Sequence, residues 1–161
     1  MDDWKLPWEG GCRCGRVRVR VTKPPLLSGA CHCTGCQKMT GSAYSLTLTI
    51  PADGFEVSKG EPVIGGLHGP VSHHFHCARC KSWLFTRAEG FDWFVNLRAP
   101  VLDDHGWFAP FVELWTGHKL PWAETGARRS YAGDPEMTEW PALMTAYAAE
   151  GARPGRANPQ G

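Results

Sequence analysis

Cys31-His32-Cys33-Thr34-Gly35-Cys36 places three thiols within six consecutive residues. A second cysteine group, Cys12-Arg13-Cys14, precedes this stretch, and a third, Cys77-Ala78-Arg79-Cys80, follows it. Thiols separated by so few residues let a single backbone turn present two sulfurs to one metal ion. The three groups therefore predict metal ligation, and zinc is the ion that such cysteine pairs most often hold.

All seven cysteines of the chain lie in these three groups. An odd number cannot be fully paired in disulfides, and the N-terminal residues lack the charged and then apolar pattern of a secretory signal peptide. We therefore expect a cytoplasmic location, where reducing conditions keep the thiols available for metal.

Seven thiols divide most simply into four for a closed structural ion and three for a second ion with an open coordination position. Spacing alone leaves the partition open, because Cys12 and Cys14 could join either the Cys31/Cys33 pair or the Cys77/Cys80 pair. The simplest alternative is one ion only, with the other three thiols serving as small apolar side chains.

Composition favours a mainly β fold. Gly and Pro together make up about a fifth of the chain, which leaves few uninterrupted runs long enough for helices. Valines alternate with arginines over residues 16–21, and Leu or Ile alternates with Thr over residues 46–50, the period of a half-buried strand. One late helix is expected, with Pro141 in its first turn and Gly151 as its stop. We expect one domain over residues 1–151 and a disordered tail over residues 152–161.

The charge distribution argues against some classes of partner. Residues 1–40 carry a net charge of +4 and residues 41–161 a net charge of −3, so neither part has the basic excess of a nucleic-acid-binding protein. No run of apolar residues is long enough to span a membrane. We therefore expect neither nucleic acid nor membrane as a partner, and either a monomer or a homodimer.

The cysteine motifs also carry a family resemblance. Gly11-Cys12-Arg13-Cys14-Gly15, Cys31-His32-Cys33-Thr34-Gly35-Cys36-Gln37-Lys38 with Gly41-Ser42, and Cys77-Ala78-Arg79-Cys80 resemble the family of glutathione-dependent formaldehyde-activating enzyme and centromere protein V. The similarity covers about half of the chain, roughly residues 9–90, and includes all seven family cysteines in order.

This resemblance implies several small coiled antiparallel β-sheets around zinc knuckles, and two zinc ions per chain. Cys12, Cys14, Cys77 and Cys80 would hold a structural zinc, and Cys31, Cys33 and Cys36 would hold a second zinc with an open position. The implied activity is that of a carbon-sulfur lyase, the S-(hydroxymethyl)glutathione synthase reaction, with glutathione or a similar thiol as partner and formaldehyde or a related aldehyde as co-substrate.

Two other interpretations remain open at the level of sequence. One is a zinc-stabilised binding module without catalysis, in which the three-cysteine site would be empty or closed by a fourth ligand. The other is a nucleic-acid or chromatin-associated module, which the basic N-terminal segment suggests and the charge distribution opposes. In the strand of residues 16–21, the arginines are more simply the solvent face.

Several polar residues near the cysteines are candidates for the functional site. Carboxylate groups of a thiol such as glutathione would need basic partners, and Lys38, Arg79, Lys81 and Arg98 are candidates, although solvated surface charge is the simpler interpretation of each. His32 is expected to lie beside the metal ligands or on the surface rather than to ligate. His74 and His76 should share a strand face without binding metal. Lys81 stands where the family usually has Gly, so a left-handed backbone is one expectation there.

Overall fold

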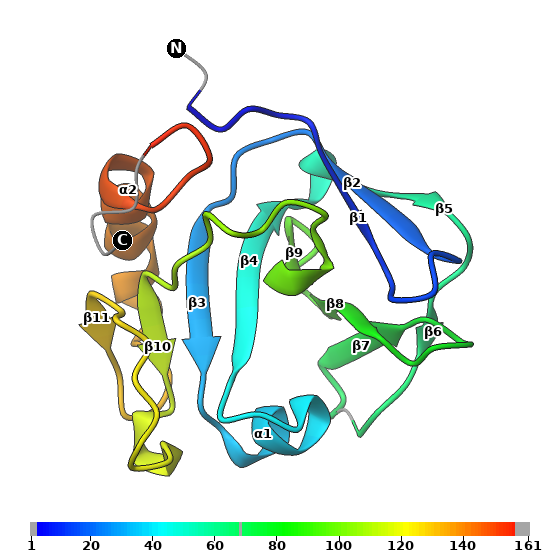
Figure 1. Cartoon of the computed structure of the whole chain (residues 1–161). Coiled ribbons are helices and arrows are strands. Elements are labelled where there is room, and N and C mark those ends of the chain that lie inside the picture. The colour runs from blue at the N-terminus through cyan, green and yellow to red at the C-terminus, as the bar shows by residue number, and fades with distance from the viewer. Residues whose placement is uncertain (1–2, 68, 157–161) are drawn as a thin grey trace.

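The computed structural model of the protein describes residues 3–67 and 69–156 (Figure 1). Within these residues two β-sheets and two α-helices are joined by short connections. The smaller sheet contains, in spatial order, β1 (Trp8–Gly11), β2 (Arg18–Val21) and β5 (Phe55–Lys59). The larger sheet contains, in spatial order, β11 (Arg129–Ser130), β10 (Val112–Leu114), β3 (Leu27–Cys31), β4 (Ser45–Pro51), β9 (Phe94–Arg98), β8 (Trp83–Ala88), β7 (Ser72–His76) and β6 (Val63–Ile64). The helices are α1 (Thr34–Thr40) and α2 (Trp140–Glu150), and short 3-10 turns cover Ala52–Gly54, Ala99–Val101, Thr116–His118 and Met137–Glu139.

The mainly β class with a C-terminal helix is confirmed. In the described part of the chain the strands form one large and one small sheet rather than several small ones. Most neighbouring strands are antiparallel, but β10 runs parallel to both β3 and β11. A parallel pairing needs a long connection, and the chain between β3 and β10 includes six other strands.

The main core lies between the two sheets. Val19 and Val21 of β2 are fully buried and belong to the same apolar cluster as Leu48 of β4 and Leu97 of β9. The alternation over residues 16–21 therefore places valines in the core and arginines at the surface, as predicted. Arg18, for example, forms an ion pair with Asp103.

The opposite face of the large sheet is polar near its centre. Strand pairing places Thr49, Asn96, Thr86 and His74 side by side on β4, β9, β8 and β7. Hydrogen bonds link the row, because Thr49 Oγ1 donates to Asn96 Oδ1 at 2.9 Å and Thr86 Oγ1 lies 2.8 Å from His74 Nδ1. All four residues of this row line one cavity, which is described with the cysteine groups below.

Helix α1 connects the end of β3 to the start of β4 (Figure 1). Its N-cap is Cys33, whose sulfur accepts a hydrogen bond from the backbone N–H of Cys36 at 3.3 Å. Its C-cap is Gly41, with φ of 64°, a left-handed conformation that glycine adopts without steric cost. The sequence analysis did not anticipate this helix, because seven residues are too few to show a helical period.

Helix α2 has the predicted boundaries, with Pro141 in its first turn and Gly151 at its end. Leu143 and Tyr147 pack against Leu27 of β3 and against Phe111 and Val112 at β10. Neither helix of the described residues is both long and apolar enough to cross a lipid bilayer.

Residues 152–156 pack against the N-terminal segment. The Arg153 guanidinium lies 4.3 Å from the centre of the Trp4 ring and donates to the carbonyl oxygen of Ala148 at 2.6 Å. The N–H of Gly155 donates to the carbonyl oxygen of Asp3 at 2.7 Å. The disordered tail over residues 152–161 stays a prediction; in its described part, residues 152–156, stacking and backbone hydrogen bonds join the polar segment to the N-terminal residues. Residues 157–161 lie outside the described part of the chain.

Candidate metal centres

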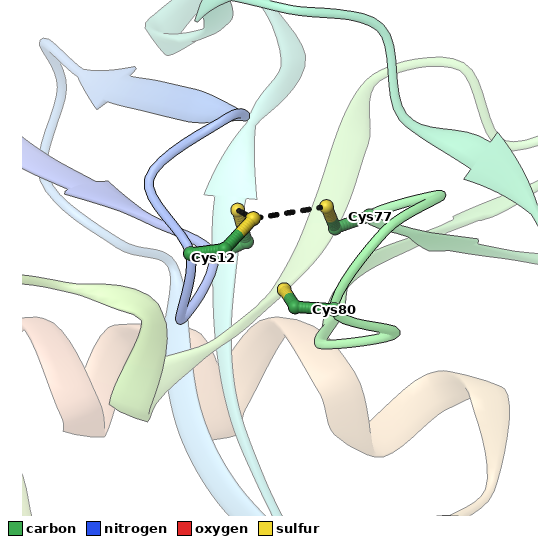
Figure 2. A group of neighbouring side chains, drawn as sticks. Cys12, Cys77 and Cys80 are labelled. Carbon is green, nitrogen blue, oxygen red and sulfur yellow. Dashed lines mark hydrogen bonds between the residues drawn. The ribbon is translucent and has the colours of Figure 1, made fainter.

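Two turns far apart in sequence bring four thiols together. Cys12 and Cys14 lie on the connection between β1 and β2, and Cys77 and Cys80 on the connection between β7 and β8. Figure 2 shows the thiols of Cys12, Cys77 and Cys80 converging from these two turns. All four sulfurs lie within 4.8 Å of one another, and Cys14 Sγ lies 3.6 Å from Cys12 Sγ and 3.7 Å from Cys77 Sγ.

These distances suit a tetrahedral ion. Zinc–sulfur bonds of about 2.3 Å place the sulfurs of a tetrahedral site about 3.8 Å apart, close to the separations observed here. Four thiols in this arrangement can enclose one ion, as a structural site requires. The group joins the same four cysteines that the family resemblance grouped, because the structure places Cys12 and Cys14 beside Cys77 and Cys80.

Hydrogen bonds hold both turns in place. The Val17 N–H donates to Cys12 Sγ at 3.3 Å, and the Arg13 N–H donates to Ser82 Oγ at 3.1 Å, which ties one turn to the other. The Ser82 hydroxyl also lies 3.2 Å from Cys80 Sγ. Burial alone would raise the pKa of Cys80, but hydrogen bonds from Ser82 and neighbouring groups lower it to about 5. The thiolate is the form that binds metal, so these contacts prepare the group for an ion.

Lys81 follows Cys80 with φ of 63°, the left-handed conformation that was one expectation for this position. A lysine in this region is strained, because its Cβ approaches the following carbonyl oxygen, whereas glycine avoids the contact. The side chain is exposed and lines neither of the two cavities described below.

Lys81→Gly should therefore raise the free energy of unfolding by about 1 kcal/mol, or the melting temperature by about 2–4 °C. Urea unfolding in the presence of zinc measures this change. Lys59→Gly is the matched control, since Lys59 is exposed at the end of β5 and is not among the residues with positive φ. That variant should lose stability, and a similar loss in Lys81→Gly would show that the turn does not strain lysine.

The other three cysteines form a second group, which lies at the C-terminal end of β3. Cys31 is the last residue of that strand, Cys33 caps α1, and Cys36 lies in the first turn of α1, which places their sulfurs within 4.8 Å of one another. The neighbouring thiol of Cys31, together with Ser45, Cys33 and the charge of Arg98, lowers the pKa of Cys36 to about 5. The pKa of Cys31 rises, because Cys31 keeps the shared proton and is buried. Three sulfurs can hold an ion and leave one position of a tetrahedron free.

His32, between two of these cysteines, is fully buried and contacts Glu113 rather than the sulfurs. Its Nε2 lies 2.9 Å from Glu113 Oε2, and its ring meets that of Tyr44 edge to face. Glu113 also accepts hydrogen bonds from Ser130 and Thr125. Burial alone would raise the pKa of Glu113, but these hydrogen bonds, that of His32 and the charge of Lys119 together lower it to about 2. Glu113 thus anchors the cysteine loop to β10.

The sequence analysis did not single out Glu113. Its one visible signal is an acidic residue between Val112 and Leu114, within a short apolar strand. A charge at a buried strand position requires partners, but the partner His32 lies 81 positions earlier in the chain.

A cavity of about 330 Å³ opens beside the three-thiol group, and we call it the sheet cavity. Its lining includes Cys31, Cys36, Trp83 and Arg98, together with the polar row of the large sheet. A second cavity of about 490 Å³ shares Trp83 and Arg98 with the sheet cavity, but no cysteine is among its lining residues within the described chain. The three-thiol group is therefore reached through the sheet cavity.

The four basic residues proposed to bind substrate carboxylates differ in exposure and in their distance from the three-thiol group's cavity, because only one of them lines it. Lys38, Arg79 and Lys81 are exposed and do not line the sheet cavity, whereas Arg98 lines it and is buried. Burial lowers the pKa of Arg98 to about 10, against the opposing effect of Cys36 and Cys31, so the guanidinium remains charged at neutral pH.

The histidines of β7 lie beside Trp83. The His74 ring meets Trp83 edge to face at 5.1 Å, and the His76 ring is stacked at 6.4 Å from it. Both therefore reach the same tryptophan, although a bulge between Phe75 and His76 interrupts the pairing with β8.

A mainly β fold with two cysteine groups, each able to hold a metal ion, defines the class of protein. The chain belongs to the family described as glutathione-dependent formaldehyde-activating enzyme, whose model matches residues 7–118. The match includes all seven cysteines and both turns of the four-thiol group.

Two relatives with the same family name agree with this assignment. A protein of Halomonas elongata named "Putative glutathione-dependent formaldehyde-activating enzyme" is 34% identical over 84% of this chain and 95% of its own length. A protein of Penicillium rubens with the same name is 30% identical over 63% of this chain and 58% of its own length. A crystal structure of a Rhodobacter sphaeroides protein aligns with a TM-score of 0.48 and 16% identity, over 59% of this chain and 87% of that one.

Proposed function

We propose that the protein is a zinc enzyme that joins a glutathione-like thiol to formaldehyde or a related aldehyde, the carbon-sulfur lyase reaction in its synthetic direction. The observation that carries this proposal is the three-thiol group that opens into the sheet cavity beside a buried arginine. Family membership supports the same reaction. Because both cysteine groups need free thiols, we also propose a reducing, cytoplasmic location.

The reaction forms one bond between the substrate sulfur and the carbonyl carbon. The carbonyl π electrons move to oxygen, and the proton released by the thiol ends on that oxygen, so that no oxidant or reductant is needed. A zinc ion held by Cys31, Cys33 and Cys36 would supply a fourth position for the incoming thiol and lower its pKa. Three thiolates already exceed the charge of such an ion, which favours positioning of the thiol over strong polarisation of the carbonyl.

The residues around the three thiols stabilise charge, position the cysteines and line the cavity. Ser45 and Arg98 stabilise negative charge on the sulfur of Cys36, a role that its lowered pKa supports. Glu113 and His32 hold the backbone that carries Cys31 and Cys33. Trp83 lines the cavity beside the three-thiol group.

The direct test is the loss of formaldehyde in the presence of glutathione, measured against the same mixture without protein. The comparison is essential because thiols add to formaldehyde unaided. We expect a rate at least tenfold above the uncatalysed rate at micromolar protein, and we expect that removal of metal by a chelator abolishes the excess. A rate equal to background with the metal-loaded protein would instead favour a zinc-stabilised binding module.

A further inference from the structure

Arg98 is a buried charge without an acidic partner in the described residues. Its side chain is in the last residue of β9 and is 9% exposed. The guanidinium makes one long hydrogen bond, from Nη2 to the carbonyl oxygen of Asn96 at 3.4 Å, and Nε has no partner within the described chain. Buried charges are normally paired, because removal from water without a compensating partner is costly.

The guanidinium is held in place even without such a partner. It lies 4.3 Å from the centre of the Trp83 ring, which is a cation–π contact. Trp83 in turn donates a hydrogen bond from Nε1 to Thr86 Oγ1 at 3.2 Å, which fixes the indole against the polar row. An arginine fixed by stacking presents its donor fork in one orientation, which suits recognition of a planar anion.

The neighbours of Arg98 indicate where that anion would come from. Arg98 lines the sheet cavity together with Cys31 and Cys36, so a molecule whose sulfur approaches the three-thiol group also passes the guanidinium. Asp134 is the one acidic residue in the described lining, and it already accepts a hydrogen bond from Trp115 Nε1 at 3.1 Å. The protein thus supplies no carboxylate to Arg98, and the polar row beside it offers uncharged groups.

We propose that Arg98 binds a carboxylate of the thiol substrate in the sheet cavity, so that the site selects thiols that carry a carboxylate near the sulfur. This inference rests on the proposed function in one respect only, that the sheet cavity receives a thiol compound. The alternative is that Arg98 only balances the negative charge of the three thiolates. The two roles differ in what they require of the ligand, since only the first depends on its carboxylates.

The test uses S-methylglutathione and its diethyl ester as probes of the zinc-loaded protein, with binding measured by calorimetry. The methylated sulfur cannot react, so binding is measured without turnover. We expect the wild-type protein to bind the free acid at least tenfold more tightly than the diester, because the ester removes both negative charges. Equal affinities would overturn the proposal, and this comparison needs no variant that could fail to fold.

Substitutions of Arg98 test whether this residue causes the tighter binding of the free acid. Arg98→Gln should reduce the affinity for the acid at least tenfold, leave that for the diester unchanged, and retain the wild-type zinc content. Arg98→Lys should recover part of the affinity, and Lys38→Gln, which removes an exposed cation on α1, should bind as wild type. Loss of one zinc from Arg98→Gln, or an unchanged preference for the acid, would show that Arg98 serves the thiolates instead.

These binding results and the turnover assay can fail separately. A protein that binds the acid through Arg98 but does not accelerate formaldehyde loss would contradict the proposed reaction and leave the carboxylate site intact. A protein that accelerates the reaction equally with glutathione and its diester would support the reaction and contradict the role of Arg98.

Discussion

Cys77→Ser is expected to leave the chain unfolded under conditions in which the wild-type protein is folded. Cys77 is 1% exposed, belongs to the main core cluster, and shares the four-thiol group with a turn 63 positions earlier in the chain. An ion bound there contributes folding free energy on the order of 10 kcal/mol, which is comparable to the whole stability of a typical domain. A serine hydroxyl in place of the thiolate loses most of this contribution.

Near-ultraviolet circular dichroism and urea unfolding measure the effect. We expect Cys77→Ser to lack the near-ultraviolet signal of packed tryptophans and to show no cooperative unfolding transition, and treatment of the wild-type protein with a strong chelator should produce the same state. A Cys77→Ser variant that unfolds cooperatively with near wild-type stability would show that the four-thiol group does not hold the fold together.

Cys33→Ser should have the opposite profile, with the fold retained and the catalytic activity lost. Cys33 is the N-cap of α1 and accepts a hydrogen bond from the Cys36 N–H, and serine is among the preferred residues at this position. The substitution therefore keeps the helix while it removes one of three sulfurs. We expect the accelerated rate of formaldehyde loss to fall at least a hundredfold, and the melting temperature to change by a few degrees at most.

Cys33→Ala separates the two roles of this side chain. Alanine removes both the sulfur and the cap, so it should lose activity to the same extent and about 1 kcal/mol more stability than the serine variant. Full activity in Cys33→Ser would mean that the three-thiol group is not the reacting site.

The sequence predicted the elements that have a clear local signal. Alternation over residues 16–21 and 46–50 identified β2 and β4, and Pro141 with Gly151 bounded α2. Helix α1 was missed because its start is marked by a capping cysteine rather than by apolar periodicity. The stacking of Arg153 on Trp4 has no local signal in the sequence, because it joins residues from the two ends of the described chain.

The sequence could not predict the parts of the site that depend on contacts between residues far apart in the chain. Spacing grouped the cysteines into three motifs, but only the fold brings the turns at Cys14 and Cys77 together. The contact between His32 and Glu113 and the stacking of Arg98 on Trp83 depend on strand neighbours that no local pattern reveals. The sequence therefore pointed to the cysteines of both groups, whose role as metal ligands stays a prediction, and left open the residues that surround them.

The central claim, a closed four-thiol site and an open three-thiol site, is tested most directly by the zinc content of the chain. Protein purified without chelator should contain two zinc ions per chain, and Cys33→Ser, purified in the same way, should contain one while it remains folded. One zinc in the wild-type protein, retained in Cys33→Ser, would contradict the open site and the function proposed for it.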